Sequence, residues 1–151
     1  MGNMDKKLTR AIFPGSFRPW HDGHEEILKK ALKLFDQVII GVGLNSEKGA
    51  VDSFKAVASI PEYFEDDPRL AVVPFEGLLA DFVKKMGGTA VIRGLRNSQD
   101  FEQEKIQQYW NEDLGLEVPV VYIIADRKLV HVSSSAIRAV EKAKQNRDKG
   151  S

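Results

Sequence analysis

Two of the three histidines of this chain, His21 and His24, stand just before an amphipathic segment and just after a glycine-containing turn. The free backbone N–H groups and the dipole of a helix N-terminus attract anions, above all phosphate. Gly23 leaves space for a phosphate near the backbone, and the hydroxyl and N–H of Ser16 can both donate. We therefore expect the active site within residues 11–26. The alternatives are a helix-capping histidine and a turn serine bonded to its own backbone.

The residue types favour direct transfer chemistry. The chain has no cysteine, and no Ser-His-Asp order or paired carboxylates stand out, so no covalent intermediate is indicated. A metal pair formed by His21 and His24 is disfavoured, because no third ligand lies nearby in the sequence. We expect catalysis by positioning and electrostatic stabilisation of phosphates.

Further cationic and hydroxyl groups follow predicted strands or begin helices. Arg93 and Arg96 flank Gly94 directly after an apolar run, where two guanidinium groups could bind phosphate bidentately or form surface salt bridges. Lys48 lies in a loop after another predicted strand. Its charge could bind phosphate, or it could be an ordinary solvated lysine. Residues 133–135 are three serines at a helix start, where an ordinary N-cap would explain only one of them.

The periodicity predicts alternating strands and helices. We expect strands at 8–13, 38–43, 70–75, 90–92 and 118–124, and helices at 24–35, 53–64 (through Pro61), 78–86, 100–113 and from 133 or 134 to about 144. This order predicts an α/β fold, a single-domain, open, doubly wound (Rossmann-like), five-stranded parallel sheet whose ligand crevice lies beyond the strand ends. The candidate groups should converge there. Gly41 and Gly43 suggest a dinucleotide motif only weakly, because Ser46 holds the third glycine position, so we favour close packing.

Composition bounds the remaining possibilities. The chain has 151 residues, 42% of them hydrophobic and 29% charged, which is typical of one globular domain. Its 22 basic residues balance 22 acidic ones, so charge gives no reason to expect nucleic acid or membrane partners. The absence of cysteine, of an apolar leader and of a long apolar run fits a cytoplasmic protein. We expect one domain over 1–151, with 1–7 and 146–151 as disordered or vector-derived tails.

Three motifs in order resemble a known family. PGSFRPWHDGH resembles the (H/T)xGH signature of the nucleotidyltransferase superfamily. VIRGLRNSQDFEQE is similar to the IRGLR…DFExE segment of bacterial phosphopantetheine adenylyltransferases, and VSSSAIR resembles the ISSS-type motif that opens their last core helix. The resemblance spans Arg10 to Val140. It implies the nucleotidyltransferase type of Rossmann-like fold and transfer of AMP from ATP to 4′-phosphopantetheine, with Mg²⁺ accompanying ATP, to give dephospho-coenzyme A and pyrophosphate.

The resemblance also implies roles for particular residues. His24, Lys48 and Arg96 would be catalytic, with His24 on the α-phosphate, and Glu104 would bind the ribose or orient Arg96. The implied ATP-binding residues are Ser16, Phe17, His21, His24, Gly94, Leu95, Arg96, Glu104, Leu129, Val130, His131, Val132, Ser133, Ser134 and Ser135. The implied acceptor-binding residues are Ser16, Lys48, Leu79 and Arg93, and no residue is implied as a metal ligand.

Some residues depart from the family pattern. His21 stands where the family commonly has Thr, Arg18 where it usually has Asp, and Gln103 where it often has Tyr, and residues 51–56 do not match the usual segment there. Rival interpretations are a sister nucleotidyltransferase with another acceptor, such as nicotinamide mononucleotide, and a non-catalytic nucleotide sensor. VSSS argues against a cytidylyltransferase, and retention of the charged groups against a sensor.

The family's hexameric assembly implies a homo-oligomer. Ile106, Tyr109 and Trp110 share one helix face at i, i+3, i+4 spacing. This face either forms an interface or packs on the chain's own sheet.

Overall fold

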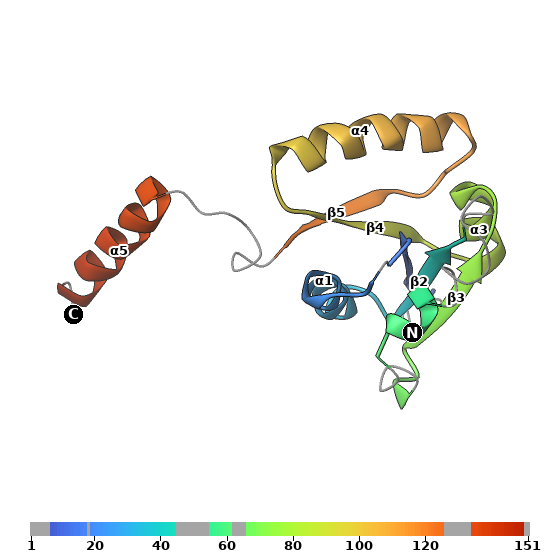
Figure 1. The fold of residues 1–151 in the computed structure, drawn as a ribbon, viewed down its shortest axis with the longest axis horizontal. Coiled ribbons are helices and arrows are strands. Elements are labelled where there is room, and N and C mark those ends of the chain that lie inside the picture. Colours follow the sequence, from blue (N-terminus) through green and yellow to red (C-terminus); the bar gives the residue numbers. More distant parts are fainter. Residues whose placement is uncertain (1–6, 18, 45–54, 62–65, 126–133, 150–151) are drawn as a thin grey trace, which may run out of the picture.

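The computed structural model describes residues 7–17, 19–44, 55–61, 66–125 and 134–149. Its centre is a sheet of five parallel strands in the order β3-β2-β1-β4-β5 (Figure 1). The strands are β1 Arg10–Gly15, β2 Gln37–Gly43, β3 Leu70–Phe75, β4 Ala90–Leu95 and β5 Val120–Ile124. The expected open, doubly wound α/β sheet is therefore confirmed. The chain order reverses between β1 and β4, which is the switch point where such sheets bind ligands.

Helices cover both faces of the sheet. Helix α1 (Asp22–Leu32) and a short helical segment at 55–59 share one apolar core with β1, which includes Phe13, Leu28 and Ala56. Helix α3 (Leu79–Met86) packs on the other face, where Phe82 and Ile12 belong to a second core. Helix α4 (Ser98–Asp113) lies across β4 and β5, with the sheet between it and α1 (Figure 1).

Two glycines let an element pack closely against its neighbour. A Cβ on Gly41 would lie 2.7 Å from the ring of Phe82, and one on Gly88 would lie 2.6 Å from Ile12. The close-packing interpretation of Gly41 is confirmed, and the dinucleotide motif has no support there. Gly87 ends α3 in the left-handed conformation, with φ of 67°.

The structure corrects several element boundaries; the helix expected at 24–35, for example, is Asp22–Leu32. The first strand runs from Arg10 to Gly15 rather than from 8 to 13, so it reaches into the motif turn. The helix expected at 53–64 ends before Pro61, because proline lacks the N–H and clashes with the preceding turn; residues 62–65 are not described. The last helix, α5, runs from Ser134 to Lys149, past the expected end at 144 and through most of the expected tail.

Figure 1 shows α5 standing apart from the layered body, beyond the end of β5. Among the residues that the structure describes, no helix is long and apolar enough to span a membrane.

Candidate active site

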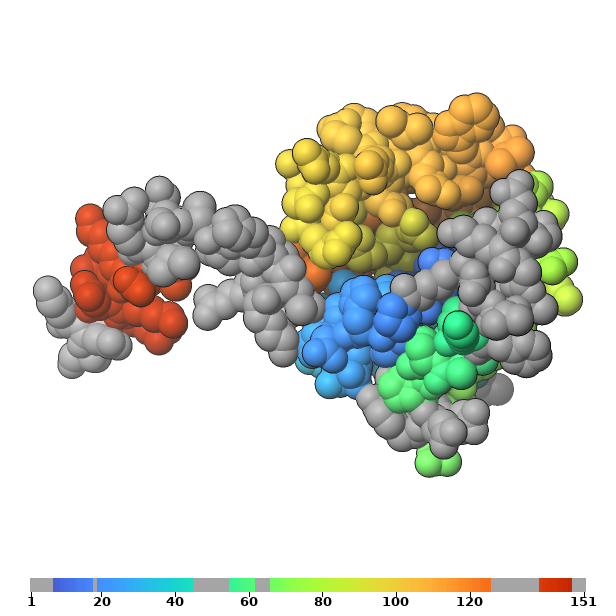
Figure 2. All heavy atoms as spheres, viewed as in Figure 1, coloured from blue at the N-terminus to red at the C-terminus, as the bar shows by residue number. Residues whose placement is uncertain are grey.

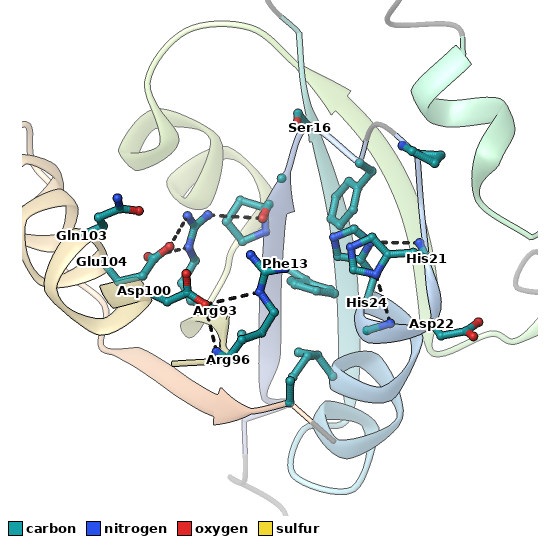
Figure 3. Close-up of a pocket in the computed structure, with 18 residues that line it drawn as sticks. Phe13, Ser16, His21, Asp22, His24, Arg93, Arg96, Asp100, Gln103 and Glu104 are labelled. Atoms are coloured by element: carbon teal, nitrogen blue, oxygen red, sulfur yellow. Dashed lines mark hydrogen bonds and ion pairs between the residues drawn. The ribbon is translucent and has the colours of Figure 1, made fainter. Parts of the chain in front are cut away.

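A cavity of about 810 Å³ opens beyond the carboxyl ends of β1 and β4. In the space-filling view it is the hollow between α4 and α1 (Figure 2). Its walls come from β1 and the following turn, the first turn of α1, the end of β4 and one side of α4. The histidines therefore face the arginines and acidic residues across one space, as Figure 3 shows.

The first turn of α1 holds the two histidines in a reciprocal capping arrangement. His21 is the N-cap residue, and its Nδ1 accepts a hydrogen bond from the N–H of Gly23 at 3.1 Å. The N–H of His21 in turn donates to Nδ1 of His24, also at 3.1 Å. The two imidazole rings stack with centroids 3.7 Å apart. The arrangement satisfies two N–H groups that a helix start leaves without partners in the helix.

Aromatic side chains surround His24. The ring centroids of Phe17 and Trp20 lie 4.9 and 5.3 Å from that of His24, and Phe13 lies 6.3 Å away. Burial, together with the nearby charges of His21 and Arg96, lowers the pKa of His24 from 6.5 to about 4. At neutral pH His24 is therefore an uncharged imidazole, able to donate one hydrogen bond to a phosphate oxygen.

The backbone around these rings is strained at one residue. Phe17 has a φ of 47°, in the left-handed region that a residue with a side chain seldom occupies. Its ring packs over Gly15, where a Cβ would lie 3.0 Å from the ring. The backbone N–H of Trp20 donates to Oγ of Ser59 at 2.9 Å, which connects the turn to the 55–59 segment. Such strain is characteristic of functional turns that the surrounding structure holds in place.

Each arginine of the β4 end is held by one acidic residue of α4. Arg93 donates from Nε and Nη2 to the two carboxylate oxygens of Glu104, at 2.9 and 2.8 Å, and from Nη1 to the carbonyl of Pro14 at 3.4 Å. Arg96 uses its backbone N–H and Nε to bond Asp100, at 3.0 and 3.3 Å. Glu104 therefore does not orient Arg96, because it holds Arg93 and Asp100 holds Arg96; binding of the ribose by Glu104 stays a prediction.

The two arginines consequently differ in what they can offer a ligand. The guanidinium of Arg93 is half-buried and is held on three of its N–H groups. The Arg96 side chain is 62% exposed, and its bond to Asp100 engages only Nε of the guanidinium. Arg96 therefore presents two amino groups to the cavity mouth, which suits a polyphosphate chain, whereas Arg93 is fixed in one orientation.

A second, smaller cavity of about 330 Å³ lies on the other side of Arg93. Leu78 and Leu79 at the start of α3, Phe75 at the end of β3, and Gln107 and Asn111 of α4 line it. Arg93, Pro14 and Gly15 line both cavities, so the two meet at the guanidinium of Arg93.

The structure brings together many of the candidate residues. Ser16, Phe17, His21, His24, Arg93, Gly94, Arg96 and Glu104 line the larger cavity, and Leu79 lines the smaller one. Leu95 ends β4 without lining either cavity. Lys48 and residues 129–133 lie outside the described residues. Ser134 and Ser135 begin α5, which stands apart from the cavity, and their side chains lie outside the described part, so their role stays a prediction.

The site also contains residues that sequence reasoning did not select. Asp100 holds Arg96, and Gln107 and Asn111 line the smaller cavity. A signal existed, because polar residues at 100, 104, 107 and 111 follow helical spacing and mark one side of α4.

Comparisons with known proteins identify the family and support the fold. Residues 12–140 match the model of a family described as Cytidylyltransferase-like. Among solved structures, a lipopolysaccharide core biosynthesis protein from Thermoplasma volcanium GSS1 has a similar fold, with a TM-score of 0.55 and 21% sequence identity. The match covers 80% of this chain and 99% of that protein. That likeness bears on the fold alone. The match of the family model over most of the chain shows that the protein is of the cytidylyltransferase-like class.

Relatives specify the family further. Phosphopantetheine adenylyltransferases from Cytophaga hutchinsonii and Flavobacterium psychrophilum are 41% and 39% identical to this chain. The matches cover 87% and 88% of this chain, and 89% and 88% of the relatives. The chain belongs to the phosphopantetheine adenylyltransferase family, whose members are nucleotidyltransferases.

Proposed function

We propose that this chain transfers AMP from ATP to 4′-phosphopantetheine, releasing pyrophosphate and forming dephospho-coenzyme A. The observation that most supports this proposal is the position of Arg93, which Glu104 holds at the point where the two cavities meet. The larger cavity has the phosphate-binding groups and room for a nucleotide. The smaller cavity, with Leu78, Leu79 and Phe75 in its wall, suits the pantetheine arm, and Arg93 then holds the acceptor's phosphate between them.

The reaction is an in-line displacement at the α-phosphorus. A phosphate oxygen of the acceptor forms a bond to the α-phosphorus while the bond to the bridging oxygen of pyrophosphate breaks, and pyrophosphate leaves with that electron pair. No proton needs to move, because the acceptor is already anionic. His24 donates a hydrogen bond to the α-phosphate, where charge builds up, and Arg96 binds the leaving phosphates.

The remaining assignments of the resemblance belong to the same proposal. Ser16, in the turn after β1, would lie between the ATP phosphates and the acceptor's phosphate. Lys48 would follow the migrating charge, and residues 129–135 would hold adenine and the β- and γ-phosphates.

Mg²⁺ would enter as part of the ATP complex. In the described part of the chain, no three His, Asp or Glu side chains are grouped as a metal site. The carboxylates of Asp100 and Glu104 are engaged by arginines. The ion would therefore be bound chiefly by ATP phosphates and water, as Mg²⁺ commonly is.

Assembly and location complete the proposal. We propose a homo-oligomer, because the α4 face made of Ile106, Tyr109 and Trp110 is exposed, at 58%, 56% and 65% of these residues' surfaces. Packing of this face on the chain's own sheet, the alternative from the sequence, is thereby excluded. The number of six copies and the cytoplasmic location are proposed from the resemblance to the family.

Pyrophosphate release tests the function. The purified protein is incubated with ATP, Mg²⁺ and one acceptor at a time: 4′-phosphopantetheine, nicotinamide mononucleotide or glycerol phosphate. Of the three acceptors, we expect only 4′-phosphopantetheine to give pyrophosphate release. Equal or faster release with another acceptor would refute the proposal, as would no release with any acceptor.

The His24→Ala variant tests the site in the same assay. Because its hydrogen bond to the phosphate is strongest in the transition state, kcat should fall about 10²- to 10³-fold while ATP binding weakens far less. Leu34→Ala, on an exposed leucine remote from both cavities, serves as the matched control. A His24→Ala kcat within about threefold of the wild-type value would refute the role of His24.

A further inference from the structure

The hydrogen bonds at the start of α1 define which nitrogen of each histidine carries the proton. A backbone N–H can only donate, so the ring nitrogen that it meets must bear a lone pair. Nδ1 of His21 accepts from Gly23, and Nδ1 of His24 accepts from His21. In a neutral imidazole the single proton must then lie on Nε2 in both rings.

This arrangement leaves Nε2–H as the group that each ring can offer to a ligand. Both histidines line the larger cavity, with their Nδ1 atoms bonded to the helix backbone (Figure 3). The stacked rings, with an interplanar angle of 28°, limit each other's rotation. Orientation and tautomer of His24 are thus determined by its neighbour at the N-cap.

We propose that His21 is a positioning residue for His24. Its backbone N–H selects the Nε2–H tautomer of His24, and its side chain holds that backbone and the His24 ring in place through the bond from Gly23 and the stacked ring. The inference rests on the proposed function for its catalytic consequence, but the tautomer itself is a property of the free protein. The family commonly has Thr at this place. A threonine hydroxyl can cap the helix, but it supplies no ring to stack on His24.

Charge makes the pair sensitive to acid. Protonation of His24 puts a proton on its Nδ1, which breaks the bond to the backbone N–H of His21 and places a cation 3.7 Å from the ring centroid of His21. The other charged side chains lining the cavity are Asp22 of α1, Arg93 and Arg96 at the β4 end, and Asp100 and Glu104 of α4. Both acids of α4 are bonded to arginines, so neither is a counter-ion reserved for a histidinium.

The test compares His21→Ala, which removes cap and ring, with His21→Thr, which restores only a cap. Side-chain nitrogens of ¹⁵N-histidine protein are observed by NMR from pH 8 to pH 3.5, and His24→Gln and His21→Thr assign the signals. In the wild type we expect protons on Nε2 of both rings and a pKa of about 4 for His24. His21→Ala keeps the backbone N–H but loses the cap bond from Gly23 and the stacked ring that hold this N–H against His24, so we expect a mixture of His24 tautomers.

The kinetic readout separates positioning from simple folding defects. For His21→Ala, kcat should fall about 10- to 100-fold, as for a misplaced catalytic group. Loss of a direct contact between His21 and ATP would appear instead in the KM for ATP. In His21→Thr the single tautomer should return and kcat should recover at least partly. The pKa of His24 should rise in His21→Thr, because the repulsion from the second imidazole is gone.

Two results would overturn the inference. One is a proton on Nδ1 of His24 in the wild-type protein. The other is a His21→Ala variant that keeps the single Nε2–H tautomer and the wild-type kcat, which would make His21 a helix cap alone. The NMR measurement needs no substrate. A wild-type protein that is inactive with phosphopantetheine would refute the proposed function, and the tautomers observed by NMR would still test the positioning role of His21.

Discussion

At the scale of single residues, the two arginines of the site differ in the way they are restrained. Glu104 binds Arg93 through both carboxylate oxygens, whereas Asp100 contacts only Nε among the guanidinium nitrogens of Arg96. A bidentate pair gives geometric specificity as well as energy. Arg93 is thus suited to holding the acceptor phosphate in one place, and Arg96 to following phosphates that move as pyrophosphate departs.

The carboxylates therefore make a matched pair of variants. Glu104→Gln keeps size but loses the charge that fixes Arg93, so the KM for 4′-phosphopantetheine should rise about tenfold, with a smaller effect on the KM for ATP. Asp100→Asn should change ATP kinetics more than acceptor kinetics. Steady-state kinetics with each substrate varied in turn measures both. The same pattern of effects in both variants would contradict this division of roles.

The histidine should also connect folding to pH. The pKa of His24 is lowered from 6.5 to about 4 in the folded protein, so the unfolded chain binds this proton more readily. The contribution of neutral His24 to the free energy of unfolding is therefore fully present above pH 6.5, and it is lost as pH falls from 6.5 towards 4.

His24→Gln removes this titration. The wild-type free energy of unfolding, relative to that of His24→Gln, should fall as pH decreases from 7 to 4.5. Urea unfolding at several pH values measures it, and a pH-independent difference would contradict the lowered pKa.

At the scale of elements, α4 shows why the site was only partly predictable. Strands and most helices follow from local patterns, because buried apolar runs and Gly-containing ends leave few choices. Helix α4 reverses the usual rule: Glu104, Gln107 and Asn111 point toward the cavities, while Tyr109 and Trp110 lie exposed. The inner face of α4 is determined by the ion pairs of Glu104 with Arg93 and of Asp100 with Arg96. These pairs depend on how α4 meets the end of β4 rather than on hydrophobic periodicity.

Long-range pairing also explains the misassigned carboxylate. Spacing places Asp100 and Glu104 one helical turn apart and makes both available to the β4 end. Which acid meets which arginine depends on how α4 lies over the sheet, and no local pattern encodes that. The motif at 14–24 was easier, because turn, glycine and helix cap are all local in sequence.

The close contact between β2 and α3 supplies a test at the same scale. Gly41→Ala would place a Cβ 2.7 Å from Phe82, whose ring stacks on Phe75 with centroids 4.3 Å apart and has little freedom to move. We expect a loss of about 1–3 kcal/mol of stability, as for other overpacked cores. Gly43→Ala is the control, because its nearest atom is 3.7 Å away. Equal unfolding midpoints in urea for both variants would contradict the packing.

At the scale of the whole molecule, the exposed apolar residues gather on α4. Phe101, Ile106, Tyr109, Trp110 and Leu114 are each 45–65% exposed along or at the end of this one helix. Isolated exposed leucines are ordinary on protein surfaces, but a row that includes Tyr and Trp is typical of interfaces. The same helix holds Arg93 through Glu104, so contacts on its outer face would steady the acceptor side of the site.

Light scattering of two charge-introducing variants tests this assembly. Wild-type protein at micromolar concentration should have several times the 16.9 kDa mass of one chain, with six copies as the proposed number. Trp110→Glu buries a charge in the interface and should give monomers or smaller oligomers. Leu34→Glu changes a residue that is 62% exposed, close to the 65% of Trp110, but lies after α1, so its mass should match the wild type. A monomeric wild-type protein, or equal masses for wild type and Trp110→Glu, would show that the exposed face of α4 does not form the interface.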